Sequence, residues 1–182
     1  LAREGAKIVK TRRGFISRLS VAAQSVHSYL SGDRETLGLS YEGIEGADVA
    51  EIESRFAEKL LATREADVKL GFTHAGPQRD DMKIEINGVD VRTFGSQGQQ
   101  RTAALSLKLA ELQLARDETA ESPILLLDDV LSELDPMRQR QLLSLVDVQT
   151  IITCTHIAAE IADALKEYKA FRVVAGTLES YR

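Results

Sequence analysis

The chain has 182 residues, of which 43% are hydrophobic and 28% charged, and its formal net charge is −5 at pH 7. A chain of this size can bury roughly 70% of its unfolded surface, which is enough for one domain with an appended segment. No apolar run approaches the ~18 residues that a membrane span requires, and the single cysteine, Cys154, excludes an internal disulfide and a multi-cysteine zinc site. We therefore expect a cytoplasmic protein without a membrane partner.

The first 18 residues are basic, although the whole chain is acidic. A solvated helix face is one interpretation of this cluster, and contact with the phosphate backbone of DNA is the other, which would show as salt-sensitive binding. The candidate DNA contacts in this segment are Arg3, Lys7, Lys10, Arg12 and Arg13. The chain starts at Leu1 without an initiator methionine and has no signal peptide, so we expect an excised fragment.

The first third of the chain shows helical and strand periodicities. Apolar residues at three- and four-residue steps predict an amphipathic helix from about residue 2 to residue 30, which Ser31-Gly32-Asp33 ends. Alternation of apolar and polar residues predicts a strand over Thr36–Glu42. A second helix is predicted from about Val49 to Glu65. No catalytic residue types cluster here, so this part is expected to be a helical lobe.

The pattern changes near residue 66 to short strands and tight loops. Val68–Phe72 alternates and predicts a strand, and Asn87-Gly88 predicts a hairpin turn. The polar loop between them contains Arg79, which either forms a loop ion pair or contacts DNA or a partner lobe. We therefore predict a helical lobe over residues 1–66 and a second domain over residues 67–182.

The remainder of the chain alternates helices with continuously apolar strands. Helices are predicted over 103–117, 137–146 and 157–167, and strands over 124–127, 150–153 and 171–174. This alternation predicts an α/β fold with a largely parallel sheet covered on both faces. Ligands of such sheets bind at the carboxyl ends of the strands, where Asp128, Asp129 and His156 fall.

Two acids follow directly after the predicted strand Ile124–Leu127. Mg²⁺ on a phosphate prefers hard oxygen ligands, so Asp128 can hold the ion while Asp129 polarises an attacking water. A strand that merely ends in solvated acids is the structural alternative.

Gly95–Arg101 is a second candidate for phosphate chemistry. It places glycines, a hydroxyl and a cation just before a predicted helix, whose amino terminus carries partial positive charge. A glycine-containing loop capped by Ser96 is the structural alternative, because serine is a good N-cap residue.

These segments together resemble a known family. Ser96–Gln99 resembles the Leu-Ser-Gly-Gly-Gln signature of ABC ATPases, with Gln97 in place of the first glycine. Ile124–Asp129 resembles their Walker B strand, Ser132–Asp135 their D-loop, and Thr155-His156 their switch region. The run from Gly76-Pro77-Gln78-Arg79-Asp80-Asp81 through the signature to the Walker B acids is similar to the bacterial RecF family in particular.

The resemblance implies the carboxy-terminal part of an ABC-type P-loop ATPase head, preceded by a mainly helical lobe. It implies ATP and Mg²⁺ as cofactors and an ATP-dependent homodimer in which two protomers sandwich ATP. The roles it implies are γ-phosphate contact in trans for Ser96, Gly98 and Gln99, a Mg²⁺ ligand for Asp128, the hydrolytic base for Asp129, a bridge between protomers for Asp135, and γ-phosphate sensing for His156. Aspartate at position 129, where transporters have glutamate, implies slow hydrolysis.

The partners implied are gapped or junction DNA and RecO-like and RecR-like mediators, with loading of the RecA recombinase and a place in replication and the SOS response. The sequence contains no Gly-x-x-x-x-Gly-Lys-[Ser/Thr] phosphate loop. We therefore expect a slow ATPase in the complete protein and an inactive chain in isolation. The alternatives are a head fragment of another SMC or ABC ATPase, such as a transporter subunit, and a non-catalytic module that binds DNA or a partner.

Overall fold

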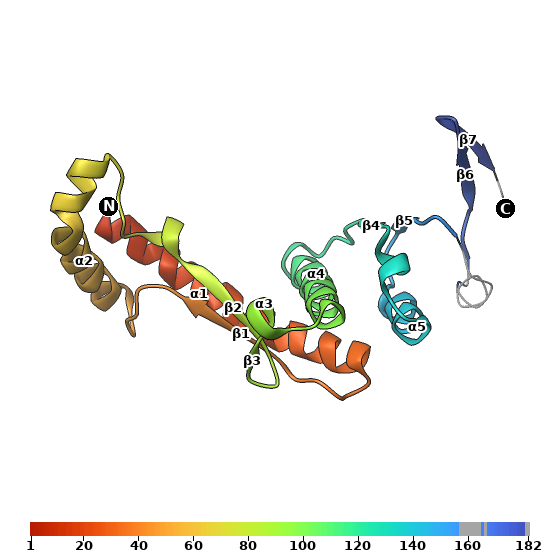
Figure 1. The fold of residues 1–182 in the computed structure, drawn as a ribbon, viewed down its shortest axis with the longest axis horizontal. Coiled ribbons are helices and arrows are strands. Elements are labelled where there is room, and N and C mark those ends of the chain that lie inside the picture. Colours follow the sequence, from red (N-terminus) through yellow and green to blue (C-terminus); the bar gives the residue numbers. More distant parts are fainter. Residues whose placement is uncertain (157–164, 166, 181–182) are drawn as a thin grey trace. The chain divides into compact units, whose positions relative to one another are not determined.

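The computed structural model describes residues 1–156, 165 and 167–180 of the chain (Figure 1). They divide into two units, Leu1–Glu121 and Ser122–Arg182, each with its own secondary structure. The boundary predicted near residue 66 falls inside a helix of the first unit. No helix among the described residues is long and apolar enough to cross a membrane.

The first unit is built on helix α1, Ala2–Ser31, which confirms the first predicted helix. Gly32 ends it in the left-handed conformation, with φ 64°. Helix α2, Val49–Leu70, packs against α1 through Ile52 and Phe56, which lie in one apolar cluster with residues of α1. The buried apolar face of α2 therefore packs against apolar residues of α1.

Helix α2 also contains a correction. Val68–Phe72, predicted as a strand, lies mostly within α2, which continues to Leu70 and ends at Gly71 in the left-handed conformation. The side chains of Val68, Leu70 and Phe72 are exposed, so the alternation does not mark a buried sheet face. Local helical hydrogen bonding decides the structure here, and glycine is the residue that stops it.

A small antiparallel sheet lies between the helices in sequence. Strand β1, Leu37–Glu42, confirms the predicted strand and pairs along its whole length with β2, Asp81–Ile86. Strand β3, Val89–Asp90, completes the predicted hairpin with β2. At its turn Asn87 and Gly88 have φ 53° and 77°. Positive φ at both central residues is the type I′ pattern, which asparagine and glycine tolerate.

Two helices complete the first unit. The 3₁₀ turn η1, Pro77–Arg79, precedes β2, and the short helix α3, Val91–Phe94, follows β3. Helix α4, Gln97–Thr119, then buries Ala103 and Ala110 in a second apolar cluster that includes Leu19 of α1. This packing fixes the start of α4 relative to the end of α1 (Figure 1).

The second unit contains the parallel pair that the sequence predicts. Its elements are β4 (Leu125–Asp128), the 3₁₀ turn η2 (Val130–Glu133), α5 (Pro136–Leu145), β5 (Thr150–Thr153), β6 (Phe171–Val174) and β7 (Thr177–Ser180). Strands β4 and β5 are parallel, whereas β6 forms an antiparallel hairpin with β7 that the sequence analysis missed. In β4, Leu125 and Leu127 are buried and Leu126 is exposed. The helix predicted over 157–167 lies almost entirely outside the described residues.

Candidate functional site

The signature segment forms the first turn of α4 rather than a loop before it. The Ser96 hydroxyl accepts from the Gln99 amide at 3.2 Å, and the Gln99 side-chain oxygen accepts from the Ser96 amide at 3.0 Å. This reciprocal pair is a capping box. Helix α4 therefore begins at Gln97 rather than at Ala103, because the Ser-x-x-Gln spacing outweighs the low helix propensity of Gly98.

The capping box leaves backbone donors at the helix start. The Gln100 amide binds the Ser96 carbonyl at 2.9 Å, and the Gln99 amide is used by the cap. Gln97 and Gly98 are exposed residues, and their amides precede the first helical hydrogen bond. Ser96 is exposed as well. A hydroxyl, two backbone donors and the positive end of a long helix suit a phosphate group.

The turn that leads into the signature is held by Gly95 and Gln100. A Cβ added at Gly95 would lie 2.5 Å from the Val91 carbonyl oxygen, so only glycine allows this approach. The Gln100 side chain donates to the carbonyls of Val91 and Gly95, at 3.1 and 3.3 Å. Asp90 caps α3, and hydrogen bonds from the side chain and amide of Thr93 lower the pKa of Asp90.

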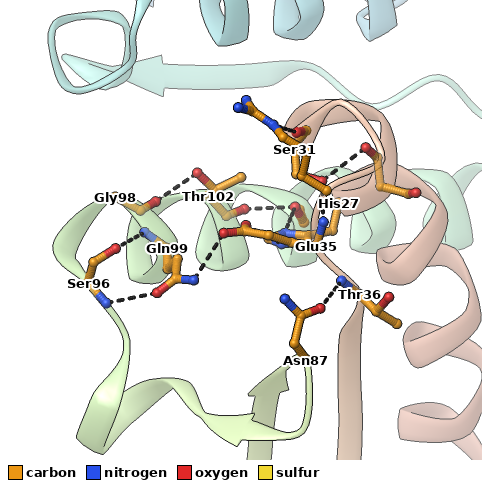
Figure 2. Close-up of polar contacts among 12 residues, drawn as sticks. His27, Ser31, Glu35, Thr36, Asn87, Ser96, Gly98, Gln99 and Thr102 are labelled. Carbon is orange, nitrogen blue, oxygen red and sulfur yellow. Dashed lines mark hydrogen bonds and ion pairs between the residues drawn. The ribbon is translucent and has the colours of Figure 1, made fainter.

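A set of partly buried polar contacts links the signature to α1. Gln99 Nε2 donates to Glu35 Oε1 at 3.0 Å, and Glu35 Oε2 faces His27 Nε2 at 3.2 Å (Figure 2). His27 is fully buried on α1, and its Nδ1 lies 3.1 Å from the Ser106 hydroxyl of α4. Sequence reasoning missed His27, Glu35 and Ser106, because these contacts join residues far apart in the chain.

In the second unit, Asp128 and Asp129 lie where β4 ends. The Thr153 hydroxyl of the neighbouring strand β5 donates to Asp128 Oδ1. The Asp129 amide donates to the Thr153 carbonyl at 3.1 Å. Asp129 itself has φ 53° and ψ 17°, a left-handed conformation that bends the chain away from the strand. Both carboxylates are exposed at the carboxyl end of the parallel pair, as predicted.

The acids at the end of β4, Asp128 and Asp129, can be compared with the ligands that Mg²⁺ usually takes in proteins. No group of three metal-ligating side chains occurs among residues 1–156, 165 and 167–180. Mg²⁺ in nucleotide sites usually takes one or two carboxylates and completes its shell with water and phosphate oxygens. An exposed Asp128 carboxylate with one oxygen bound by Thr153 therefore fits such a site.

Asp135 is the N-cap of α5. Its Oδ1 accepts from the amides of Met137 and Arg138, each at 3.0 Å, and its Oδ2 accepts from the Arg138 side chain at 3.2 Å. The turn before it is closed by the Ser132 hydroxyl, which donates to the Asp129 carbonyl at 2.8 Å. His156 is exposed and follows β5. The second unit thus holds Asp128, Asp129, Asp135 and His156, and the first holds the signature residues.

The basic residues of α1 divide into two groups. Arg13 donates to the carbonyls of Gly46 and Ile44, at 2.6 and 2.8 Å, and Arg12 donates to the Pro77 carbonyl at 2.5 Å. These two arginines fasten loops of the first unit to α1. The exposed residues Arg3, Lys7 and Lys10 instead follow one another at helical spacing, and Lys7 pairs with Glu4 at 2.9 Å.

Arg79 lies in the loop before β2. Its guanidinium carbon is 5.3 Å from the centroid of the Phe72 ring, a cation–π distance. The Phe72 ring also lies 4.6 Å from the ring of His74, which pairs with Asp67 of α2. Arg79 is exposed, so this stacking leaves its charge at the surface.

Comparison with known proteins shows which proteins share this sequence and this fold. No family model matches the chain. The DNA replication and repair protein RecF of Lachnoclostridium phytofermentans is 47% identical over 176 residues, which are 96% of this chain and 47% of that protein. RecF of Agathobacter rectalis is 48% identical over 176 residues, with the same two shares. The chain therefore spans about half the length of the curated relatives it matches.

Solved structures give the same result. A structure of the recombination mediator protein RecF with ATP, from the RecFOR pathway, superposes with a TM-score of 0.83 at 35% identity, covering 100% of this chain and 48% of that one. A structure from a study of SMC ATPases matches with a TM-score of 0.57 at 12% identity, over 94% of this chain and 87% of that one, which shows a shared fold alone.

The identities extend over nearly the whole chain, and the structural match to RecF covers all of it. The predicted α/β architecture is confirmed by the same match. The chain belongs to the RecF family of DNA replication and repair proteins.

Proposed function

We propose that this chain supplies the signature, Walker B, D-loop and switch elements of an ATP-dependent DNA-binding protein of recombinational repair. In the complete protein two protomers hold ATP between them and act at gapped or junction DNA, with RecO-like and RecR-like mediators, to help load a recombinase. The observation that carries the proposal is the capped start of α4, where the exposed residues Ser96, Gln97 and Gly98 offer a hydroxyl and two backbone amides suited to a phosphate.

The signature acts on nucleotide held by another protomer. The chain has no Gly-x-x-x-x-Gly-Lys-[Ser/Thr] sequence, so the main phosphate cradle is made by residues outside it. Ser96, Gly98 and Gln99 then approach the γ-phosphate from across the dimer, with the Ser96 hydroxyl, the Gly98 amide and the Gln99 side-chain NH₂ group as donors. This arrangement makes dimerisation depend on ATP, because the phosphate joins the two surfaces.

The second unit supplies the hydrolytic chemistry. Asp128 holds Mg²⁺, which when bound offsets negative charge on the phosphates. Asp129 accepts a proton from the attacking water, and its amide is fixed by Thr153 so that the carboxylate starts from a defined position. Asp135 orders the start of α5 and lies toward the dimer partner, and His156 senses the γ-phosphate. Hydrolysis by this set is slow.

DNA binding uses the exposed basic stripe of α1. Arg3, Lys7 and Lys10 present ammonium and guanidinium groups on one face of the helix. Their contacts with phosphates are independent of base sequence and weaken as salt rises. Arg79 adds a further surface charge in the loop before β2.

The decisive experiment places an arginine in the signature. In the complete protein, Ser96→Arg removes the N-cap hydroxyl and fills the approach to the Gln97 and Gly98 amides. Thr119→Arg, at the exposed far end of the same helix, adds the same charge and is the matched control. Sedimentation with and without ATP should show dimers for the control and monomers for Ser96→Arg, while both keep their helical circular dichroism. ATP-dependent dimers of Ser96→Arg would contradict the proposal.

A further inference from the structure

The hydrogen bonds around Gln99 form a closed ring, which begins at Gly98 and returns to Gln99, both in the signature. From Gly98, the ring runs through the Thr102 hydroxyl, which donates to the Gly98 carbonyl at 2.7 Å. The Ser106 hydroxyl donates to the Thr102 carbonyl at 2.7 Å, and His27 and Glu35 lead from Ser106 back to Gln99. Figure 2 shows the side chains of His27, Glu35, Gln99 and Thr102 converging between α4 and the end of α1. Thr102, Ser106 and His27 are all fully buried.

The donors and acceptors of the ring determine where its protons lie. The Ser106 hydroxyl gives its proton to the Thr102 carbonyl, so the oxygen accepts from His27 Nδ1. His27 Nε2 faces the Glu35 carboxylate, and two lone pairs at 3.2 Å would repel each other. One proton therefore lies between Nε2 and Oε2, on the imidazole or on the carboxyl group. With that proton in place, every contact in the ring has one donor and one acceptor.

Glu35 is itself held at its backbone. Its amide donates to the Ser31 hydroxyl at 3.3 Å, just beyond the last turn of α1. The next residue, Thr36, exchanges two hydrogen bonds with Asn87 of the β2–β3 turn, at 2.8 and 2.9 Å. The Glu35 side chain is only 17% exposed. Its carboxylate therefore presents Oε1 to Gln99 from a fixed position.

Gln99 uses both ends of its side-chain amide within the first unit. The oxygen accepts from the Ser96 amide, and Nε2 donates to Glu35. Glu35 thereby selects which end of the amide faces Ser96, since a flipped amide would turn an oxygen toward a carboxylate. The same orientation of the side-chain amide also fixes the direction of the second Nε2–H group of Gln99.

We propose that Glu35 is a positioning residue for the signature, which acts by orienting the Gln99 side chain while buried His27 holds Glu35 in place. The inference rests on the proposed function, in which the signature meets ATP across a dimer. It adds that the junction between α1 and β1 sets the geometry of the ATP signature.

The test is a double-mutant cycle on ATP-dependent dimerisation of the complete protein. Glu35→Ala should weaken the ATP-dependent dimer by roughly three- to tenfold, the range expected for the loss of one hydrogen bond. In a Gln99→Ala background the same change should alter it by less than about twofold, because Glu35 would act only through Gln99. Glu118→Ala, which removes an exposed carboxylate from the same unit, is the charge-matched control and should have no effect.

Side-chain amide NMR of the 182-residue chain gives a readout that does not need ATP. The Gln99 amide pair is identified by its loss in Gln99→Ala, and Glu35→Ala should move its hydrogen-bonded proton toward the position of a free glutamine. Should Glu35→Ala not fold, Glu35→Gln keeps the shape of the side chain but replaces one carboxylate oxygen with an NH₂ group, so that only one oxygen can still accept. An intermediate loss of dimerisation and a smaller shift are then expected.

The outcomes separate the two proposals. Equal effects of Glu35→Ala with and without Gln99, or an unmoved Gln99 amide resonance, would overturn the positioning role. Normal ATP-dependent dimers in Gln99→Ala would instead refute the trans role of Gln99 and the link from Glu35 to ATP. In that case the amide resonance alone decides whether Glu35 orients Gln99.

Discussion

Two glycines of α1 should respond in opposite directions to the same substitution. A Cβ at Gly5 would lie 2.0 Å from the Phe56 ring, whereas a Cβ at Gly14 would meet nothing within 4 Å. In a helix, alanine is favoured over glycine by about 1 kcal/mol. At Gly5 this gain competes with overpacking, which typically costs about 1–3 kcal/mol. Phe56 is only 2% exposed and cannot turn into solvent, so the cost should lie at the upper end of that range.

We therefore expect Gly5→Ala to lower the free energy of unfolding by about 2 kcal/mol and Gly14→Ala to raise it by about 0.5–1 kcal/mol. Urea unfolding followed by circular dichroism at 222 nm measures both, because α1, α2 and α4 dominate the signal. Adding Phe56→Leu to Gly5→Ala should recover part of the loss by freeing space. Shifts of the same sign at both glycines would refute the packing of α1 against α2.

The other predictions concern catalysis, DNA and pH. In the complete protein, Asp129→Asn should lower ATP turnover by ~10² or more while ATP-dependent dimers persist, and unchanged phosphate release would remove Asp129 from the role of base. Lys10→Ala should reduce the slope of log DNA affinity against log salt concentration by about the amount of one phosphate contact. Arg13→Ala should instead chiefly lower the stability of the protein. Fluorescence anisotropy titrations with DNA at several salt concentrations distinguish the two variants. The hydrogen bond with His74 lowers the pKa of Asp67 below its ordinary value of 3.8, so this stabilisation is present above about pH 4 and is lost as pH falls through the lower native pKa. The urea midpoints of wild type and Asp67→Asn should therefore converge at acid pH, and a gap that widens there would contradict the pairing.

Long periodic patterns and strong turn chemistry were sufficient to predict much of the fold. The apolar stripe of α1 and the Asn87-Gly88 turn each specify their structure locally, and both are observed. The segment Val68–Phe72 shows the limit of this reasoning, because alternation over five residues does not distinguish a strand from the exposed end of a helix. Its residues lack the cross-strand neighbours whose side-chain packing would stabilise an extended conformation.

The start of α4 differs from the prediction for another reason. Glycines in the signature suggested a loop, yet Ser96 and Gln99 stand at the spacing of a capping box, a signal available from the sequence. The ring through His27 and Glu35 offers no such signal, because its partners are joined by tertiary packing. The capping-box spacing therefore predicts where α4 and the signature begin. The packing of α1 on α4 determines how the side chains of the signature are held.

The left-handed backbone at Asp129 restricts which acid can follow strand β4. Apart from glycine, asparagine and aspartate are the residues that adopt this conformation most readily, since a short polar side chain can bind nearby backbone groups. The Asp129 side chain makes no capping hydrogen bond in this turn, so the fit rests on the readiness of aspartate itself to adopt a positive φ. The backbone of the turn that ends strand β4 therefore favours aspartate over a longer acid at position 129.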